Sequence, residues 1–61
     1  MVEKLKRLMK YNNLSQKELA KKLNTSTVFI SRFLGGKRKP TIEFAIKISN
    51  EFDVSLDWLL K

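Results

Sequence analysis

The side chains best suited to chemistry in this 61-residue chain are cations and hydroxyls that lie between residues 26 and 41. Ser26, Thr27, Ser31 and Arg32 fall close together, and the basic run Lys37-Arg38-Lys39 follows them. A guanidinium group can donate two parallel hydrogen bonds, whereas an ammonium group acts as a point charge for anions. These residue types indicate binding to an anionic partner rather than a reaction on a substrate.

The residue types that most enzymes need are missing or dispersed. The chain has no Cys and no His, so it lacks the usual zinc ligands and the commonest general base near neutral pH. Its six acidic residues are scattered among positive charges and do not suggest a pair of catalytic carboxylates. We therefore expect no enzymatic activity, no metal site, no cofactor and no small-molecule ligand.

The overall charge favours a nucleic-acid partner. Thirteen Lys and Arg residues against six Asp and Glu residues give a formal charge of +7 and a pI of about 10.1. Such an excess on a small domain is typical of nucleic-acid binders, although a generic basic surface is the alternative. No apolar run approaches the roughly 20 residues that cross a bilayer, and no signal peptide is visible. We expect a soluble, cytoplasmic protein that has no contact with membranes.

The length predicts one domain over residues 1–61, and the hydrophobic spacing predicts that it is all-α with five helices. The first helix covers Val2–Tyr11 and stops at Asn12-Asn13, because Asn tolerates the left-handed conformation. The second follows Ser15, since Ser15-Gln16-Lys17-Glu18 is a capping box. Its predicted buried stripe consists of Leu19, Ala20 and Leu23.

The remaining three helices are marked by their caps and turn residues. Ser26 caps a third helix, about residues 26–34, which Gly35-Gly36 ends before an exposed basic loop over residues 37–40. Thr41 caps a fourth helix, and Ser55 caps a short fifth helix with Val54 and Leu59 as its hydrophobic staple. One face of the fourth helix is predicted to carry Ile42, Ala45, Ile48 and Phe52.

The second and third helices have the pattern of a helix-turn-helix unit. Asn24 stands where a sharp turn needs a positive φ, and Ile30 and Phe33 can pack back onto the second helix. At about 100° per residue, the opposite side of the third helix shows one acid-free sector. It contains Thr27, Val28, Ser31 and Arg32.

This outward sector is suited to reading base edges in DNA. Arg32 can pair with guanine, and the methyl groups of Thr27 and Val28 can contact thymine methyl groups. The alternative is an ordinary solvated helix face, but Val28 and the neighbouring Phe29 would then be exposed without a reason.

Three motifs occur in one order: Ser15-Gln16-x-Glu18-Leu19-Ala20-x-x-Leu23, then Ser26-x-x-x-Ile30-Ser31-Arg32, then residues 36–40 as Gly-Lys-Arg-Lys-Pro. The chain, from about Leu5 to Leu60 and including the tail over residues 52–60, resembles the phage repressor and Cro (XRE-like) helix-turn-helix family. This resemblance implies a five-helix, lambda-repressor-like DNA-binding domain with the third helix in the major groove.

The resemblance also implies roles for individual residues. Base-reading positions match Thr27, Val28 and Arg32, with Ser31 assisting. Gln16 matches a phosphate-anchoring position at the start of the second helix, where free N–H groups favour an anion. Further backbone contacts are expected from Ser26, Lys37, Arg38, Lys39 and Thr41, and such contacts position the protein without specifying sequence.

The chain departs from the family pattern at several positions. Met9 and Leu34 replace an Arg and a Glu that commonly form a partly buried salt bridge, so we predict that these two apolar side chains touch. Asn24 replaces a Gly, and Gly35 replaces an Asn, which keeps residues that tolerate positive φ. Phe29 replaces a small polar residue, and two interpretations stay open: contact with a sugar or thymine methyl group, or packing against the protein.

Apolar residues near the end of the chain allow two interpretations. Leu56, Trp58 and Leu60 are a candidate dimer contact, because family members bind two half-sites as two-fold dimers. Alternatively, Trp58 covers the small core of the monomer. With no separate dimerisation domain in these residues, we expect a weak homodimer or a dimer that forms on DNA. The chain is either a fragment that lacks an oligomerising part or a small Cro-like protein.

The predicted function is sequence-specific binding to a two-fold-symmetric operator in double-stranded DNA, with the protein acting as a bacterial or phage-encoded transcriptional repressor. One alternative is an antitoxin or restriction-controller protein that regulates its own gene. Another is a basic helical module that binds acidic proteins, in which case residues of the third helix would matter little.

Overall fold

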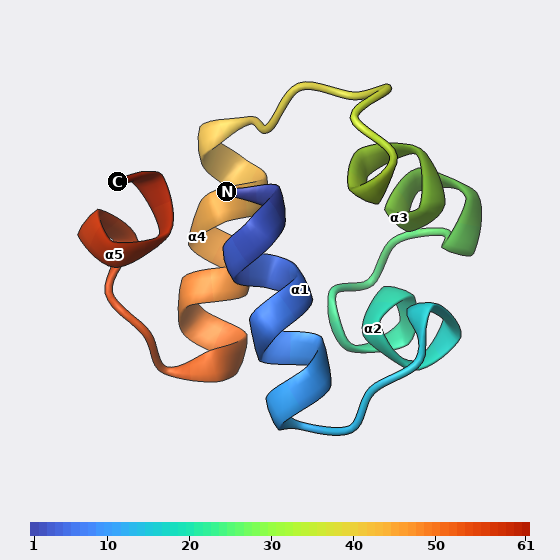
Figure 1. Cartoon of the computed structure of the whole chain (residues 1–61), viewed down its shortest axis with the longest axis horizontal. Helices are drawn as coiled ribbons and strands as arrows, with labels where there is room; N and C mark the ends of the chain where they lie inside the picture. Colours follow the sequence, from blue (N-terminus) through green and yellow to red (C-terminus); the bar gives the residue numbers. More distant parts are fainter.

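Five helices follow one another along the chain in the computed structural model, which describes all 61 residues and contains no strand (Figure 1). Their bounds are α1 Val2–Tyr11, α2 Gln16–Lys22, α3 Thr27–Leu34, α4 Ile42–Phe52 and α5 Leu56–Leu60. The prediction of an all-α fold with five helices is confirmed. None of these helices is long and apolar enough to cross a membrane.

Hydroxyl side chains begin four of the five helices, as the sequence predicts. The oxygen of each cap accepts a hydrogen bond of 3.0–3.1 Å from the backbone N–H three residues later. Each bond satisfies one of the N–H groups that have no partner within the helix. The four caps are Ser15, Ser26, Thr41 and Ser55.

The capping box at α2 is reciprocal and affects the charge of Glu18. The Ser15 N–H donates to Glu18 Oε1 at 3.0 Å, while the Glu18 N–H donates to the Ser15 hydroxyl oxygen at 3.1 Å. These hydrogen bonds lower the pKa of the Glu18 carboxyl group, and the bond from the Ser15 backbone has the largest effect, followed by the bond with the Ser15 side chain. The nearby positive charge of Lys22 lowers this pKa further. The box is therefore intact at neutral pH, and its contribution to stability is lost as the pH falls through this lowered pKa.

Residues in the left-handed conformation end four of the helices or follow their ends. Asn13 and Asn24 have φ of 55°, which confirms the predicted stop after α1 and the predicted sharp turn after α2. After α3, the left-handed residue is Gly36, with φ of 77°, whereas Gly35 has φ of −84°. Asp53 adopts φ of 53° at the end of α4, a position that sequence reasoning did not select.

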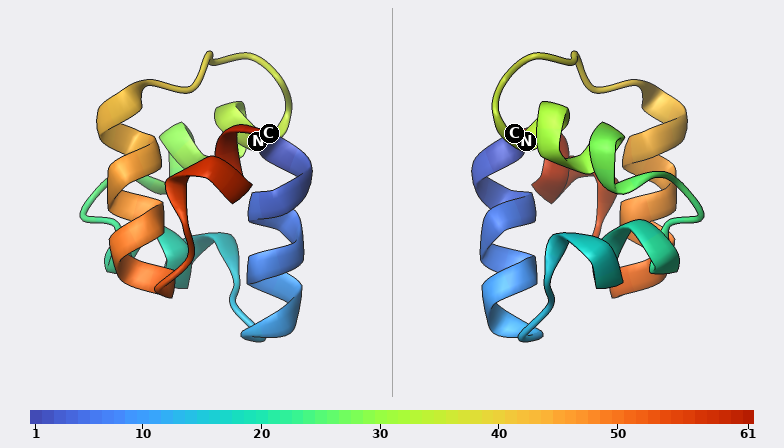
Figure 2. Two further views of the ribbon diagram at one scale, coloured as in Figure 1. Left: turned by 90° about the vertical axis from the view of Figure 1, so that its left-hand side faces the viewer. Right: turned by 90° about the vertical axis from the view of Figure 1, so that its right-hand side faces the viewer.

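The core draws side chains from every helix. α3 packs against both α1 and α2, and α5 packs against α4. Figure 2 shows α1 and α4 flanking α5 on one side of the molecule, with α2 and α3 exposed on the opposite side. The buried stripe predicted for α2 is confirmed. The core cluster consists of Leu5, Leu8, Leu19, Ala20, Leu23, Ile30, Phe33, Phe44, Ile48 and Leu59.

The predicted inner face of α4 is wrong at one position. Ile42 is 58% exposed, while Phe44, which the prediction omitted, is only 6% exposed. At about 100° per residue, Ile42 lies roughly 120° around the helix from the centre of the face that contains Phe44, Ile48 and Phe52. The ring of Phe44 fills the interior instead, with its centroid 4.8 Å from that of Phe33.

The two ends of the chain lie on the same side of the molecule, with α5 beside the start of α1 (Figures 1 and 2). The Lys4 ammonium group donates a hydrogen bond to the Trp58 carbonyl oxygen and lies 5.4 Å from the centroid of the indole ring. Trp58 remains 37% exposed. Its ring is therefore partly covered by α1, and part of it stays on the surface.

Two adjacent leucines in α5 test whether this short helix is an integral part of the core. Leu59 is fully buried, whereas Leu60 is 52% exposed. We expect Leu59→Ala to lower the free energy of unfolding by about 2–5 kcal/mol, because it removes buried methyl groups and leaves a cavity. Leu60→Ala should change it by less than about 0.5 kcal/mol. Urea denaturation followed by circular dichroism measures both, and equal effects would contradict this packing.

Candidate nucleic-acid interface

α3 separates an inner face in the core from an outer face in solvent. Ile30 and Phe33 are fully buried. The other side of the helix exposes the four residues predicted to read bases: Thr27, Val28, Ser31 and Arg32. Val28 is 61% exposed, although burial of a valine side chain is favourable. An exposed aliphatic group beside hydroxyls and a guanidinium is suited to contact with thymine methyl groups.

The turn between α2 and α3 fixes the direction in which this outer face points. Asn24 reverses the chain in the left-handed conformation, and the Thr25 N–H donates to the Ala20 carbonyl oxygen at 2.9 Å. Lys47 of α4 donates to the Leu23 carbonyl oxygen at 3.5 Å, so a third helix contacts the end of α2. These bonds and the shared core hold α3 in one orientation.

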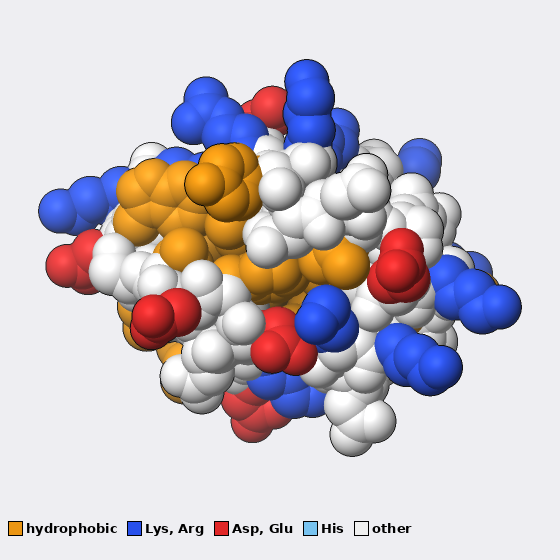
Figure 3. Space-filling view, turned by 90° about the horizontal axis from the view of Figure 1, so that it is seen from below, with side chains coloured by type: hydrophobic (Ala, Val, Ile, Leu, Met, Phe, Trp, Pro, Cys, Tyr) orange, Lys and Arg blue, Asp and Glu red, His pale blue; other side chains and the backbone are white.

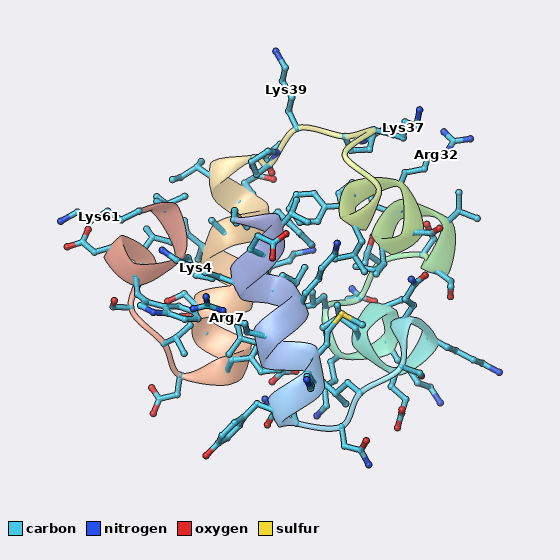
Figure 4. The ribbon with its side chains drawn as sticks, viewed as in Figure 1. Lys4, Arg7, Arg32, Lys37, Lys39 and Lys61 are labelled. Carbon is cyan, nitrogen blue, oxygen red and sulfur yellow. The ribbon has the colours of Figure 1, made fainter.

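The basic loop begins directly beside the outer face of α3. The Lys37 N–H donates to the Arg32 carbonyl oxygen at 2.8 Å, and Gly36 provides the left-handed residue that this closure needs. Figure 4 shows Arg32, Lys37 and Lys39 projecting from this end of the molecule, away from Lys4 and Lys61. The structure therefore brings the loop cations to the end of the helix that carries Arg32.

Phe29 packs against the protein, as the second of the two interpretations of this residue predicts. Its ring centroid lies 5.1 Å from that of Phe44, in an edge-to-face arrangement, and 6.5 Å from that of Phe33. The Arg38 guanidinium lies over the same ring, with its central carbon 5.0 Å from the centroid. Phe29 therefore connects the aromatic core to the basic loop, and a cation–π contact holds Arg38 beside α3.

The polar residues expected at the DNA backbone are all exposed, and two of them have a second role. Ser26 and Thr41 accept backbone hydrogen bonds as caps of α3 and α4. A hydroxyl group has one proton as well as its acceptor lone pairs, so each cap can still donate to a phosphate oxygen. Gln16 is the first residue of α2 and is also exposed.

A surface hollow joins α1 to the two helices of the motif. Its lining residues are Lys6 and Met9 from α1, Gln16 from α2, and Ser31 and Leu34 from α3, together with Gly35. Met9 and Leu34 both pack against the core here, in agreement with their predicted proximity, and their direct contact stays a prediction. Sequence reasoning did not select Lys6, because a lysine on the polar face of an amphipathic helix has no distinguishing local pattern.

Comparison with known proteins agrees with this architecture. A profile of helix-turn-helix proteins matches residues 5–59. The HTH-type transcriptional regulator YqaE of Bacillus subtilis is 41% identical over 59 residues, which are 97% of this chain and 51% of that protein. The HTH-type transcriptional activator BcrR of Enterococcus faecalis is 41% identical over 58 residues, which are 95% of this chain and 28% of that protein.

A third relative is nearer to this chain in length. An HTH-type transcriptional regulator of Methanocaldococcus jannaschii is 39% identical over 57 residues, which are 93% of this chain and 86% of that protein. The chain thus spans about half of the Bacillus relative and most of the Methanocaldococcus relative. No solved structure matches the chain significantly.

Substitutions at the neighbouring residues Phe29 and Val28 test whether the first side chain serves packing and the second contacts bases. We expect Phe29→Ala to lower the free energy of unfolding by about 1–3 kcal/mol, less than for a fully buried phenylalanine, and to leave base preference unchanged. Val28→Ala should change stability by less than about 0.5 kcal/mol and alter the preference for thymine at one position. Thermal denaturation and binding to a panel of duplexes measure these effects. A changed base preference in Phe29→Ala without loss of stability would contradict the assignment.

Proposed function

Because the chain belongs to the helix-turn-helix family of DNA-binding transcriptional regulators, we propose that α3 enters the major groove of a specific operator and that the protein represses transcription by occupying it. The observation that carries this proposal is the exposed, acid-free face of α3 beside the basic loop. In this docking mode, the recognition helix contacts base edges while surrounding residues contact the backbone.

The interface has two kinds of contact. Arg32 donates two hydrogen bonds to guanine, Thr27 and Val28 contact thymine methyl groups, and Ser31 assists. The phosphate contacts come from Gln16, Ser26, Lys37, Arg38, Lys39 and Thr41. They set the register and orientation of α3 on the duplex, while the base contacts supply the sequence preference.

Repression follows from occupancy of the site. A bound domain excludes polymerase sterically, whereas activation requires a further contact with the transcription machinery. BcrR, which is named as an activator, shares only 28% of its length with this chain. A reporter gene placed behind the selected operator distinguishes the two roles, because repression lowers its expression and activation raises it.

A two-fold operator requires two copies of this domain. Its principal extents are 26 × 23 × 19 Å, which are shorter than the separation of about 34 Å between half-sites one helical turn apart. We propose that the copies associate weakly through α5, where Trp58 is 37% and Leu60 is 52% exposed and Leu56 is half-buried. Gel-shift titration on one and two half-sites tests this association, since weak dimers bind the paired site cooperatively.

The experiment that tests the proposed function is selection of bound duplexes from a random DNA library at near-physiological salt. We expect enrichment of a two-fold-symmetric site with half-sites about one helical turn apart. Salt-sensitive binding to every duplex without enrichment would contradict sequence-specific recognition and leave a basic helical domain. Absence of DNA binding altogether would favour an acidic protein partner.

Two substitutions separate base contacts from phosphate contacts. Arg32→Ala should weaken binding to the selected operator by about 1–3 kcal/mol and relax the preference at one base pair. Lys37→Ala should weaken binding to all duplexes similarly and reduce the slope of log K against log salt concentration by about 0.9. Fluorescence anisotropy over a range of salt concentrations measures both. The same behaviour of the two variants on every sequence would refute this division.

A further inference from the structure

We propose that Lys6 of α1 binds a phosphodiester group of the same duplex, so that the interface extends from α2 and α3 onto α1. This inference rests on the proposed function and adds to it a contact that neither the motif nor the basic loop contains. The site is the hollow that Lys6 lines together with Gln16, Ser31 and Gly35, over Met9 and Leu34.

The location of Lys6 follows from the packing of α1. Leu5 and Leu8 are buried on the inner side of this helix, and α1 contacts α3 directly. Lys6 is exposed and lines the same hollow as Gln16 and Ser31, two residues proposed to contact DNA. The right-hand view in Figure 2 shows α1 bordering the face on which α2 and α3 are exposed. A duplex on that face therefore lies next to α1.

The residues around the hollow match the chemistry of a nucleic-acid backbone. An ammonium group, an amide and a hydroxyl supply donors for the anionic phosphate oxygens. Met9 and Leu34 supply apolar surface beside these donors, which suits the carbon atoms of a deoxyribose.

Charge distinguishes this hollow from the others on the molecule. Each of the other four surface hollows is lined by a glutamate: Glu51, Glu18, Glu43 and again Glu18. The Lys6 hollow has no acidic residue in its lining. Figure 3 shows positive and negative side chains interspersed on another face, the one seen from below. A hollow whose lining contains a cation and no carboxylate attracts an anion more strongly than one whose lining contains both.

Lys10 provides a matched control on the same helix. It is exposed like Lys6 and lies one turn further along α1. It lines a different hollow, which also contains Glu18. Removing either lysine changes the net charge by the same amount, so a difference between the two variants reports the position of the charge rather than its total.

The test is the salt dependence of binding to the selected operator, measured for the full chain and for Lys6→Ala and Lys10→Ala. We expect Lys6→Ala to reduce the slope of log K against log salt concentration by about 0.9, as for the loss of one phosphate contact. Its base preference should not change, and Lys10→Ala should keep the wild-type slope. Circular dichroism checks that both variants are folded, and Lys6→Gln provides a second variant that retains a donor and a longer side chain.

Two outcomes would overturn the inference. One is a wild-type slope for both Lys6→Ala and Lys6→Gln, and the other is an equal loss of slope for Lys6→Ala and Lys10→Ala. Failure of wild type to bind any duplex would instead refute the proposed function.

Discussion

The burial of one face of α3 is the constraint on which the rest of the molecule depends. A chain of 61 residues with no cysteine and no histidine has neither a disulfide nor the usual zinc ligands to support a small core. Ile30 and Phe33 therefore have to serve the core, and they do so against both α1 and α2. Because a helix presents different residues every 100°, anchoring these two side chains also sets which residues of α3 face outward.

The aromatic cluster extends this constraint to the basic loop. Phe44 contacts the rings of Phe29 and Phe33 edge to face, and Arg38 lies over Phe29. A loop of lysines and arginines repels itself and is entropically costly to order. Stacking on a ring that is already held by the core reduces the freedom of one of its cations before any ligand binds. The same packing thus stabilises the fold and orders part of the proposed binding surface.

The excess positive charge is distributed over the whole surface rather than collected on one side. Lys4 binds the end of α5, and Lys47 contacts the end of α2, so some cations serve the fold. Around α3, the hollow lined by Lys6, Gln16 and Ser31 has no carboxylate in its lining, whereas the hollow that Phe29 lines contains Glu43. Net charge alone therefore indicates the class of partner, while the arrangement of acids and bases indicates where that partner binds.

The helices, their caps and the outward residues of α3 were predictable from the sequence because each depends on neighbours within one turn. A hydroxyl three residues before a free N–H predicts a cap, and Asn24 between two helical patterns predicts a left-handed turn.

The inner face of α4 was predicted incorrectly at Ile42, and the packing of Phe29 was left open. The closeness of Lys6 to Gln16 and Ser31 had no signal in the sequence at all. These three features depend on how helices distant along the chain pack together. Local backbone periodicity sets the direction of a side chain around its own helix, but it contains no information about which other helix lies in that direction.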